Sequence, residues 1–410
     1  MLIKLGWRNL RRNFWRTFVS VMGITGSVFI CVFLDGIQTG SYQQFIRNGV
    51  RSASGHITLM HKDYLSQREV EFRFSLSNLE ENISVMNSVE RVSPRLTIPA
   101  LARSSRNSEG VGLLGLRLET DVDENPLLKS EFLMAGSWPR KGKLKDAVIG
   151  IDLAKYLGLK LGYKFVVMAQ DQNGEIASKL FKVRGILQTG MRMIDRSTII
   201  TQLKSAQKLI GVSDEVHEIA VLLKDDELIS STLDAINQLI SPVQSSGLRA
   251  VNWRESIPQL VSLIRLDRYN GILMASFLMV IVGIGLINSL VMSVLERRRE
   301  IGLLRAIGLQ DVQIQKMIFV EGFFMSLIGN LLGLTLASIA ILYTSTYGID
   351  FSEMIKEASV AGITIDSTVY TAWNLRGTFI ICSVMTFITL IASWYPARMA
   401  AQIMPAQSMR

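Results

Sequence analysis

Residues 271–295, GILMASFLMVIVGIGLINSLVMSVL, form a run of 25 positions without one charged side chain. About 20 consecutive apolar residues are enough to cross the ~30 Å hydrocarbon core of a membrane as a helix. Three further runs of comparable character lie at Thr17–Leu34, Met317–Leu342 and Gly377–Tyr395. The sequence therefore predicts an α-helical membrane protein with four transmembrane helices.

The composition agrees with this class, because 49% of the 410 residues are hydrophobic and 19% are charged. The first run could instead be a secretory signal peptide, since basic residues precede it, but it is long for that role and no small-residue cleavage site follows. Both cysteines, Cys31 and Cys382, fall inside predicted spans. We therefore expect the large segment between the first two spans to depend on its own core and not on disulfides.

Lysine and arginine are concentrated in three short segments beside the spans. Residues 1–16, 296–316 and 396–410 together carry twelve basic and three acidic residues, which accounts for the whole formal net charge of +9. The positive-inside rule places these segments, and with them both termini, in the cytoplasm. Residues 35–270 and 343–376 are then extracytoplasmic. The positive charge is explained by membrane orientation and not by nucleic-acid binding.

Two helices are expected to extend beyond the bilayer. Residues from Pro258 to Leu295 show one uninterrupted helical pattern, which would reach ~57 Å at 1.5 Å per residue. The helical pattern also continues after Leu34. The first two spans would then stand out of the membrane as a stalk. Residues 1–16 have basic and apolar positions at helical spacing, which indicates either an amphipathic interfacial helix or a plain basic flank.

The segment 35–270 has the pattern of an α/β domain between spans 1 and 2. Alternating strands and helices occur at both of its ends, within residues 56–98 and 216–251. These two β-α-β halves predict one sheet built from both ends of the segment. Residues from about 125 to 212 have their own strand, helix and hairpin, with an Asn173-Gly174 turn. We interpret this stretch as an inserted subdomain.

Motifs for catalysis, cofactors and metals are not found. The nearest approach to a phosphate-binding loop, Gly136 to Leu144, has the wrong glycine spacing and leucine where serine or threonine should hold magnesium. We therefore expect this chain not to hydrolyse ATP and to bind no cofactor of its own. The histidines His56, His61 and His217 are too scattered for a zinc site, so ordinary strand or surface roles are expected.

Two features lie inside the third predicted span. Glu321 is the one clear acid within the spans, and a carboxylate in hydrocarbon is a functional candidate by default. It lies near the cytoplasmic end, however, where it could reach water or a basic residue. Gly329 and Gly333 are spaced for close helix packing, although this motif is weak evidence for dimerisation.

The segment after the second span has a more specific pattern. It runs Glu296-Arg-Arg-Arg-Glu-Ile-Gly-Leu-Leu-Arg-Ala-Ile-Gly308, so a helix there would present basic and apolar residues to a cytoplasmic partner. We predict a cytoplasmic coupling helix over 296–316. The residues expected to act in ATPase coupling are Glu296, Arg297, Arg298, Arg299, Glu300, Ile301, Leu304, Arg305 and Gly308.

This segment resembles the signature of the FtsX-like permease family, which also places it after the second of four spans. Trp7-Arg8-Asn9-Leu10 and Tyr395-Pro396-Ala397-Arg398 are similar to the start and end of that family, and Val148-Ile149-Gly150 resembles its MacB-type periplasmic core. The resemblance implies a bacterial ABC transporter in the cytoplasmic membrane. Its expected partners are a cytoplasmic ATPase dimer, which binds ATP and magnesium, and a second permease copy or homologue. The outer domain would comprise "porter" and "sabre" parts.

Within the family, Gly55-His56-Ile57 resembles the lipoprotein-releasing LolC/LolE branch. This implies extraction of lipoproteins or other amphiphiles from the outer leaflet of the cytoplasmic membrane. LolC-like members have a long hairpin that hooks a periplasmic carrier, whereas Ala169–Lys179 here is a short turn, so carrier docking stays open. The alternatives are an FtsX-like regulatory transmitter acting on cell-wall hydrolases and a MacB-like peptide or small-molecule exporter. The residues that either meet cargo or merely face lipid are Phe33, Leu34, Ile37, Ile272 and Leu273.

Overall fold

The computed structural model describes residues 14–67, 69–76, 78–118, 128, 130–189, 192–241, 247–351 and 368–403. The chain divides into two compact units. The membrane unit contains the described residues up to Tyr42, from Ile264 to Asp350 and from Thr368 onward. The α/β unit contains the described residues from Gln43 to Leu263. Residues 1–13 of the predicted amphipathic helix lie outside the described residues.

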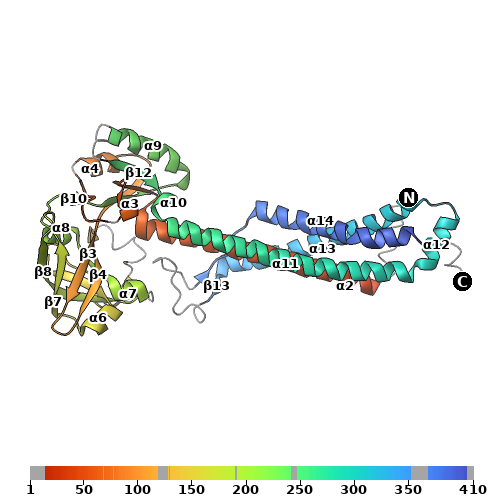
Figure 1. Cartoon of the computed structure of the whole chain (residues 1–410), viewed down its shortest axis with the longest axis horizontal. Coiled ribbons are helices and arrows are strands. Elements are labelled where there is room, and N and C mark those ends of the chain that lie inside the picture. The colour runs from red at the N-terminus through yellow and green to blue at the C-terminus, as the bar shows by residue number, and fades with distance from the viewer. Residues whose placement is uncertain are drawn as a thin grey trace. The chain divides into compact units, whose positions relative to one another are not determined.

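Four long helices build the membrane unit (Figure 1). They are α2 (Phe14–Gly49), α11 (Pro258–Glu296), α13 (Asp311–Tyr347) and α14 (Leu375–Ala401). Each is long and apolar enough to cross a membrane, which confirms the four predicted transmembrane helices. The continuous helix predicted from Pro258 to Leu295 is confirmed by α11, and α2 likewise continues well past Leu34.

Apolar side chains from all four helices share one core. Val28 of α2, Leu286 of α11, Ala337 of α13 and Met385 of α14 are all buried in it. The outward faces remain apolar and exposed, as expected for helices that meet lipid instead of water.

Small residues allow α13 to approach α2 closely. A Cβ atom added to Gly333 would lie 2.8 Å from Cβ of Val28, and one added to Gly329 would lie 2.5 Å from Cγ2 of Ile24. Both distances are too short for a real side chain, so the close helix packing predicted at the glycine pair occurs within the chain, between α13 and α2.

The segment between α13 and α14 makes a contact with α2. Strands β13 (Ile349–Asp350) and β14 (Thr368–Val369) pair, and Ala372 then donates its N–H to the carbonyl oxygen of Gly36 over 3.0 Å. Most of this predicted extracytoplasmic loop, residues 352–367, lies outside the described residues.

The last helix is longer than the predicted span. The tail predicted from residue 396 onward begins in fact as helix, because α14 includes Pro396 and continues to Ala401. Residues 404–410 lie outside the described residues.

The α/β unit is organised around one sheet of ten strands (Figure 1). The strand order is β12-β1-β11-β3-β4-β9-β6-β8-β5, and β7 pairs with β3 and β8. The strands are β1 (Ile57–His61), β3 (Val89–Arg103), β4 (Ser108–Leu116), β5 (Leu133–Gly136), β6 (Asp146–Gly150), β7 (Lys164–Gln170), β8 (Ile176–Leu187), β9 (Thr198–Gln202), β11 (Glu218–Leu223) and β12 (Leu248–Asn252). A separate pair joins β2 (Phe74–Ser75) and β10 (Glu215–Val216).

The long strand β3 belongs to two groups of strands. Its first half pairs with β11, beside β1 and β12, so strands from both ends of the segment share one sheet as predicted. Its second half, from Leu96, pairs with β4 and β7. This second group therefore begins further upstream than the insertion predicted at 125–212. The predicted hairpin is present, with Gly174 in its turn at φ 82°.

Helices pack their apolar sides on the sheet. In α9 (Ile229–Ile240), Ile229, Leu233, Ile236 and Ile240 recur at helical spacing, and the last two are buried in the main core. The other helices of this unit are α3 (Tyr64–Gln67), α4 (Leu79–Ser84), α6 (Ile151–Leu157), α7 (Arg192–Ser197), α8 (Leu203–Leu209) and α10 (Trp253–Ser256).

Candidate functional site

The predicted coupling segment forms a short helix, α12 (Arg298–Ala306), between α11 and α13. Its end is set by Gly308, whose φ of 105° suits glycine, and α13 then starts with a reciprocal capping box between Gln310 and Gln313. The single helix predicted over 296–316 is therefore wrong. Glu296 ends α11, and the residues from Asp311 onward belong to α13.

One side of α12 packs against the chain itself. Ile301 is 2% exposed and lies in a cluster with Ile314 and Ile318 of α13 and Ala397 of α14. Leu304 is half-buried. Ile301, predicted as a coupling residue, is thus a core residue, and its side chain is not available to a partner.

A buried ion pair fixes the start of α12 to α13. Nη1 of Arg297 lies 2.9 Å from Oε1 and 3.2 Å from Oε2 of Glu321, and both residues are less than 10% exposed. Nε of Arg297 also lies 3.7 Å from the more exposed Glu300. Of the two interpretations of Glu321, the structure shows the one in which it meets a basic residue. Arg297 is correspondingly occupied inside the protein.

Two further arginine contacts hold the segment at its edges. Arg305 donates to the carbonyl oxygen of Ile403 over 2.6 Å and to Asp311 over 2.7 Å. Arg16 of α2 donates to Glu296 over 2.6 Å, which links the end of α11 to the start of α2. The segment is therefore attached to α2, α13 and the end of α14.

The face that α12 leaves exposed differs from the predicted one. Leu303 is 53% exposed and Ile307 73% exposed, and Arg298 and Arg299 are also exposed. Our sequence analysis did not include Leu303 or Ile307 among the coupling residues. Their spacing of four positions was the available signal, but Ile301 and Leu304 are also at helical spacing, so the pattern alone does not tell which apolar stripe faces inward.

The predicted cargo-facing residues divide into two groups. Leu34, Ile272 and Leu273 are about half exposed on α2 and α11. Phe33 and Ile37 are half-buried, and Phe33 stacks on Phe29 and packs against the helix core. The exposed group is thus the part of the prediction that remains accessible in this chain.

Polar groups join α2 to α11 near the end of α2 and the start of α11. The hydroxyl of Tyr42 donates to Oδ2 of Asp267 over 2.7 Å, and Gln38 lies within hydrogen-bond distance of the same residue. Nearer the opposite end, the hydroxyls of Ser20 and Ser289 are 2.6 Å apart. Contacts between α2 and α11 are therefore polar at several separate points.

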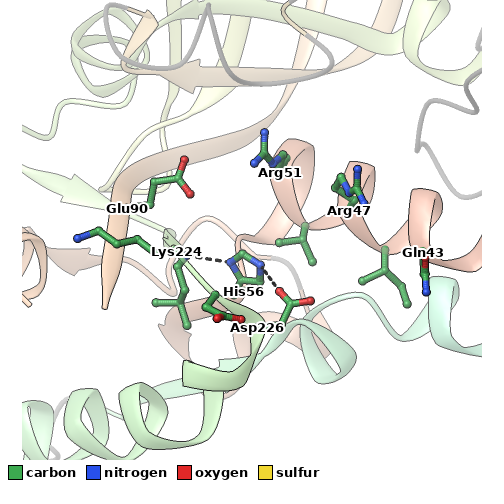
Figure 2. Close-up of a pocket in the computed structure, with 11 residues that line it drawn as sticks. Gln43, Arg47, Arg51, His56, Glu90, Lys224 and Asp226 are labelled. Atoms are coloured by element: carbon green, nitrogen blue, oxygen red, sulfur yellow. Dashed lines mark hydrogen bonds and ion pairs between the residues drawn. The ribbon is translucent and has the colours of Figure 1, made fainter. Parts of the chain in front are cut away.

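A pocket of about 430 Å³ lies in the α/β unit, where the last turns of α2 meet β1 and the end of β11 (Figure 2). His56 is at its wall: Nδ1 accepts the N–H of Leu223 over 2.8 Å, and Nε2 lies 2.9 Å from Asp226. Burial lowers the pKa of His56, against the opposing effect of Asp226. The charged residues of the lining are three basic and three acidic, namely Arg47, Arg51, Lys224, Glu90, Asp225 and Asp226. This balance selects no ligand of either sign.

The described residues contain no group of three or more His, Cys, Asp or Glu that could hold a metal ion. At the hairpin between β7 and β8, Gln172 donates its N–H to the carbonyl oxygen of Ile210 over 3.1 Å. The turn at Ala169–Lys179 is thus short and attached to the body of the α/β unit.

Comparison with known families and proteins accounts for both units. A model for the MacB-like periplasmic core domain matches residues 17–239, and a model for the FtsX-like permease C-terminal region matches residues 272–405. Among curated relatives, the lipoprotein-releasing system transmembrane protein LolC of Neisseria meningitidis is 23% identical, over 99% of this chain and 98% of that protein. The macrolide export ATP-binding/permease protein MacB of Campylobacter jejuni is 24% identical, over 99% of this chain and 60% of that protein.

A similar solved structure is the periplasmic region of MacB from Actinobacillus actinomycetemcomitans, with a TM-score of 0.37 and 14% identity over 54% of this chain and 98% of that one. The first family model covers most of α2 and of the α/β unit, and the second covers most of α11 together with α13 and α14. The chain is therefore a membrane permease of the FtsX-like ABC transporter family with a MacB-like periplasmic core domain.

Proposed function

We propose that this permease receives motion from a separate cytoplasmic ATPase dimer at the exposed face of α12 and passes it across the membrane to the α/β unit. The ATPase supplies the binding sites for ATP and magnesium. A second permease, either another copy or a homologue, completes the transporter in the bacterial cytoplasmic membrane. The moving parts extract lipoproteins or other amphiphiles from the outer leaflet.

The exposed face of α12 is the observation that carries this proposal. A short helix with two apolar side chains in the open, Leu303 and Ile307, beside Arg298 and Arg299, has the composition of a docking surface. Its other side packs against α13 and α14, so a force applied to α12 reaches both of these membrane helices. Excess basic charge in and around this segment supports a cytoplasmic position.

The cargo is proposed from the relatives. LolC of Neisseria meningitidis is named as part of a lipoprotein-releasing system, and the alignment covers nearly all of both chains. The apolar residues Leu34 of α2 and Ile272 and Leu273 of α11 are about half exposed, so acyl chains could make contact with them. Carrier capture by the β7–β8 hairpin is not part of the proposal, because that turn is short and attached to Ile210.

The docking face can be tested by placing carboxylates on it. The double variant Leu303→Asp and Ile307→Asp should abolish copurification of the ATPase, because it puts charge into an apolar contact. Leu101→Asp is the matched control, since Leu101 is 41% exposed in the α/β unit. ATPase binding that survives the double variant and equals that of the control would refute docking at this face.

The cargo can be tested with a photocrosslinker at Leu34 or Ile272, in membranes that contain the ATPase. Crosslinks to lipoproteins, lost when ATP is hydrolysed, would support extraction. Crosslinks to peptides or small molecules would indicate a MacB-like exporter instead. No crosslink at these positions, together with a crosslink to a cell-wall hydrolase from a second photocrosslinker on the α/β unit, would indicate a regulatory transmitter.

A further inference from the structure

The chain leaves α2 through an uncommon turn. Residues Val50–Ser54 form a π-helical segment, and Gly55 follows with φ 67°. A Cβ atom on Gly55 would lie 2.6 Å from the carbonyl oxygen of Val221. The end of α2 is therefore held directly against the backbone of β11 in the α/β unit.

His56, the next residue, uses both ring nitrogens at this point (Figure 2). Because Nδ1 accepts the N–H of Leu223, the ring proton is on Nε2 and is donated to Asp226. The side chain is 14% exposed, and the lowered pKa keeps the ring neutral near pH 7. The carbonyl oxygen of His56 also accepts the N–H of Trp253 over 3.1 Å.

The two residues that the ring holds belong to different elements. Leu223 is the last residue of β11, and Asp226 is the first residue of a 3₁₀ turn, Asp226–Leu228, that leads directly into α9. The ladder between β1 and β11 ends at the pair Ile57 and Val221. Beyond that pair, the imidazole ring contacts the segment that enters α9 through Asp226.

We propose that His56 is a positioning residue: its ring holds the turn that leads into α9 at a fixed position relative to the end of α2, so that the two move together. Movement of the first membrane helix is then carried to β11 by the backbone, where His56 donates its N–H to the carbonyl oxygen of Val221 over 2.8 Å, and from there to the entry of α9 by the imidazole. The proposal rests on the proposed function, in which α2 transmits motion from the ATPase.

The test uses the full transporter with its ATPase in lipid nanodiscs. Spin labels at Gln43, in the last turns of α2, and at Gln238, on the exposed side of α9, report the distance between the two elements. In the otherwise unchanged protein we expect one narrow distance distribution, the same with and without trapped ATP. In His56→Ala we expect trapped ATP to change the ratio of distance populations by about two- to thirtyfold, the range over which single contacts alter coupling.

Two further variants separate positioning from general folding. His56→Asn keeps an acceptor for the N–H of Leu223 and should restore part of the fixed distance. His61→Ala, at the other end of β1 where the ring stacks on Phe72, should behave like the unchanged protein. Asp226→Asn replaces His56→Ala if the latter does not fold.

An unchanged distribution in His56→Ala with the ATPase bound would overturn the role of His56 alone. Equal loosening in His61→Ala would also overturn it, because the effect would then be general destabilisation. Failure of the ATPase to copurify with the unchanged permease would instead refute the proposed function, on which this role depends.

Discussion

Separating the buried ion pair of Arg297 and Glu321 should destabilise the membrane unit strongly. Both residues are less than 10% exposed, and removal of one partner leaves the other charge buried without this ion pair. Such a change costs about 3–5 kcal/mol. Glu321→Leu should lie near the lower end, at about 3 kcal/mol, because Arg297 retains Glu300 at 3.7 Å. Arg297→Met should fall in the same range.

Removing both charges together should recover most of the loss. The double variant Arg297→Met with Glu321→Leu leaves no charge buried at this site, and such replacements are often neutral or stabilise by about 1–4 kcal/mol. The exposed pair of Arg16 and Glu296 is the matched control. Their side chains are 26% and 40% exposed, so solvent screens the pair and Glu296→Leu should cost much less than either single variant of the buried pair.

The assay is the free energy of unfolding of each purified variant in mild detergent, measured by titration with a denaturing detergent. The variants form a double-mutant cycle, so the coupling between the two side chains is obtained without assigning the cost to either. If Glu321→Leu costs no more than Glu296→Leu, or if the double variant is as unstable as the sum of the singles, the reasoning is wrong.

Three further changes test other parts of the fold. Gly333→Ala should destabilise by about 1–3 kcal/mol through overpacking against Val28, whereas Gly285→Ala, with nothing within 4 Å, should not; unfolding titrations compare them. Gly55→Ala should cost about 1–3 kcal/mol because φ is 67° and Val221 blocks the added carbon, as thermal unfolding would show. Burial lowers the pKa of His217 from 6.5 to about 4, so the unfolded chain takes up the proton first. Stability should therefore fall by about 3 kcal/mol as pH drops from 6.5 to 4, and unfolding of His217→Asn across that range should show a flatter profile.

The membrane helices and about half of the described strands could be predicted because their signals are local. A run such as 271–295 has no alternative to a spanning helix, and Asn173-Gly174 between two alternating segments forms the expected hairpin. The parallel pairing of β4 with β9 could not be predicted, because residues about 85 positions apart carry no mutual pattern in a single sequence. The membership of β3 in two groups was missed for the same reason.

The candidate site was predicted at the level of the segment and not of the side chain. Apolar residues occur on two stripes of α12, and which stripe is buried depends on α13 and α14, which supply Ile314, Ile318 and Ala397. The pairing of Arg297 with Glu321 had a visible signal, since a lone carboxylate inside a span near an arginine-rich segment needs a partner. The choice among three consecutive arginines depends on the turn between α11 and α12.

The close fit of α2 against Gly329 and Gly333 has a consequence for assembly. These two glycines are already covered by Ile24 and Val28 of the same chain, so a neighbouring subunit in the bilayer cannot pack against them. Such a neighbour would meet large side chains, for example Phe277 and Ile281 on α11, which are more than 60% exposed. An interface formed by large side chains that can rotate has many packing arrangements of similar energy. Two permeases joined along it could shift past each other during a cycle while each bundle keeps its own internal contacts.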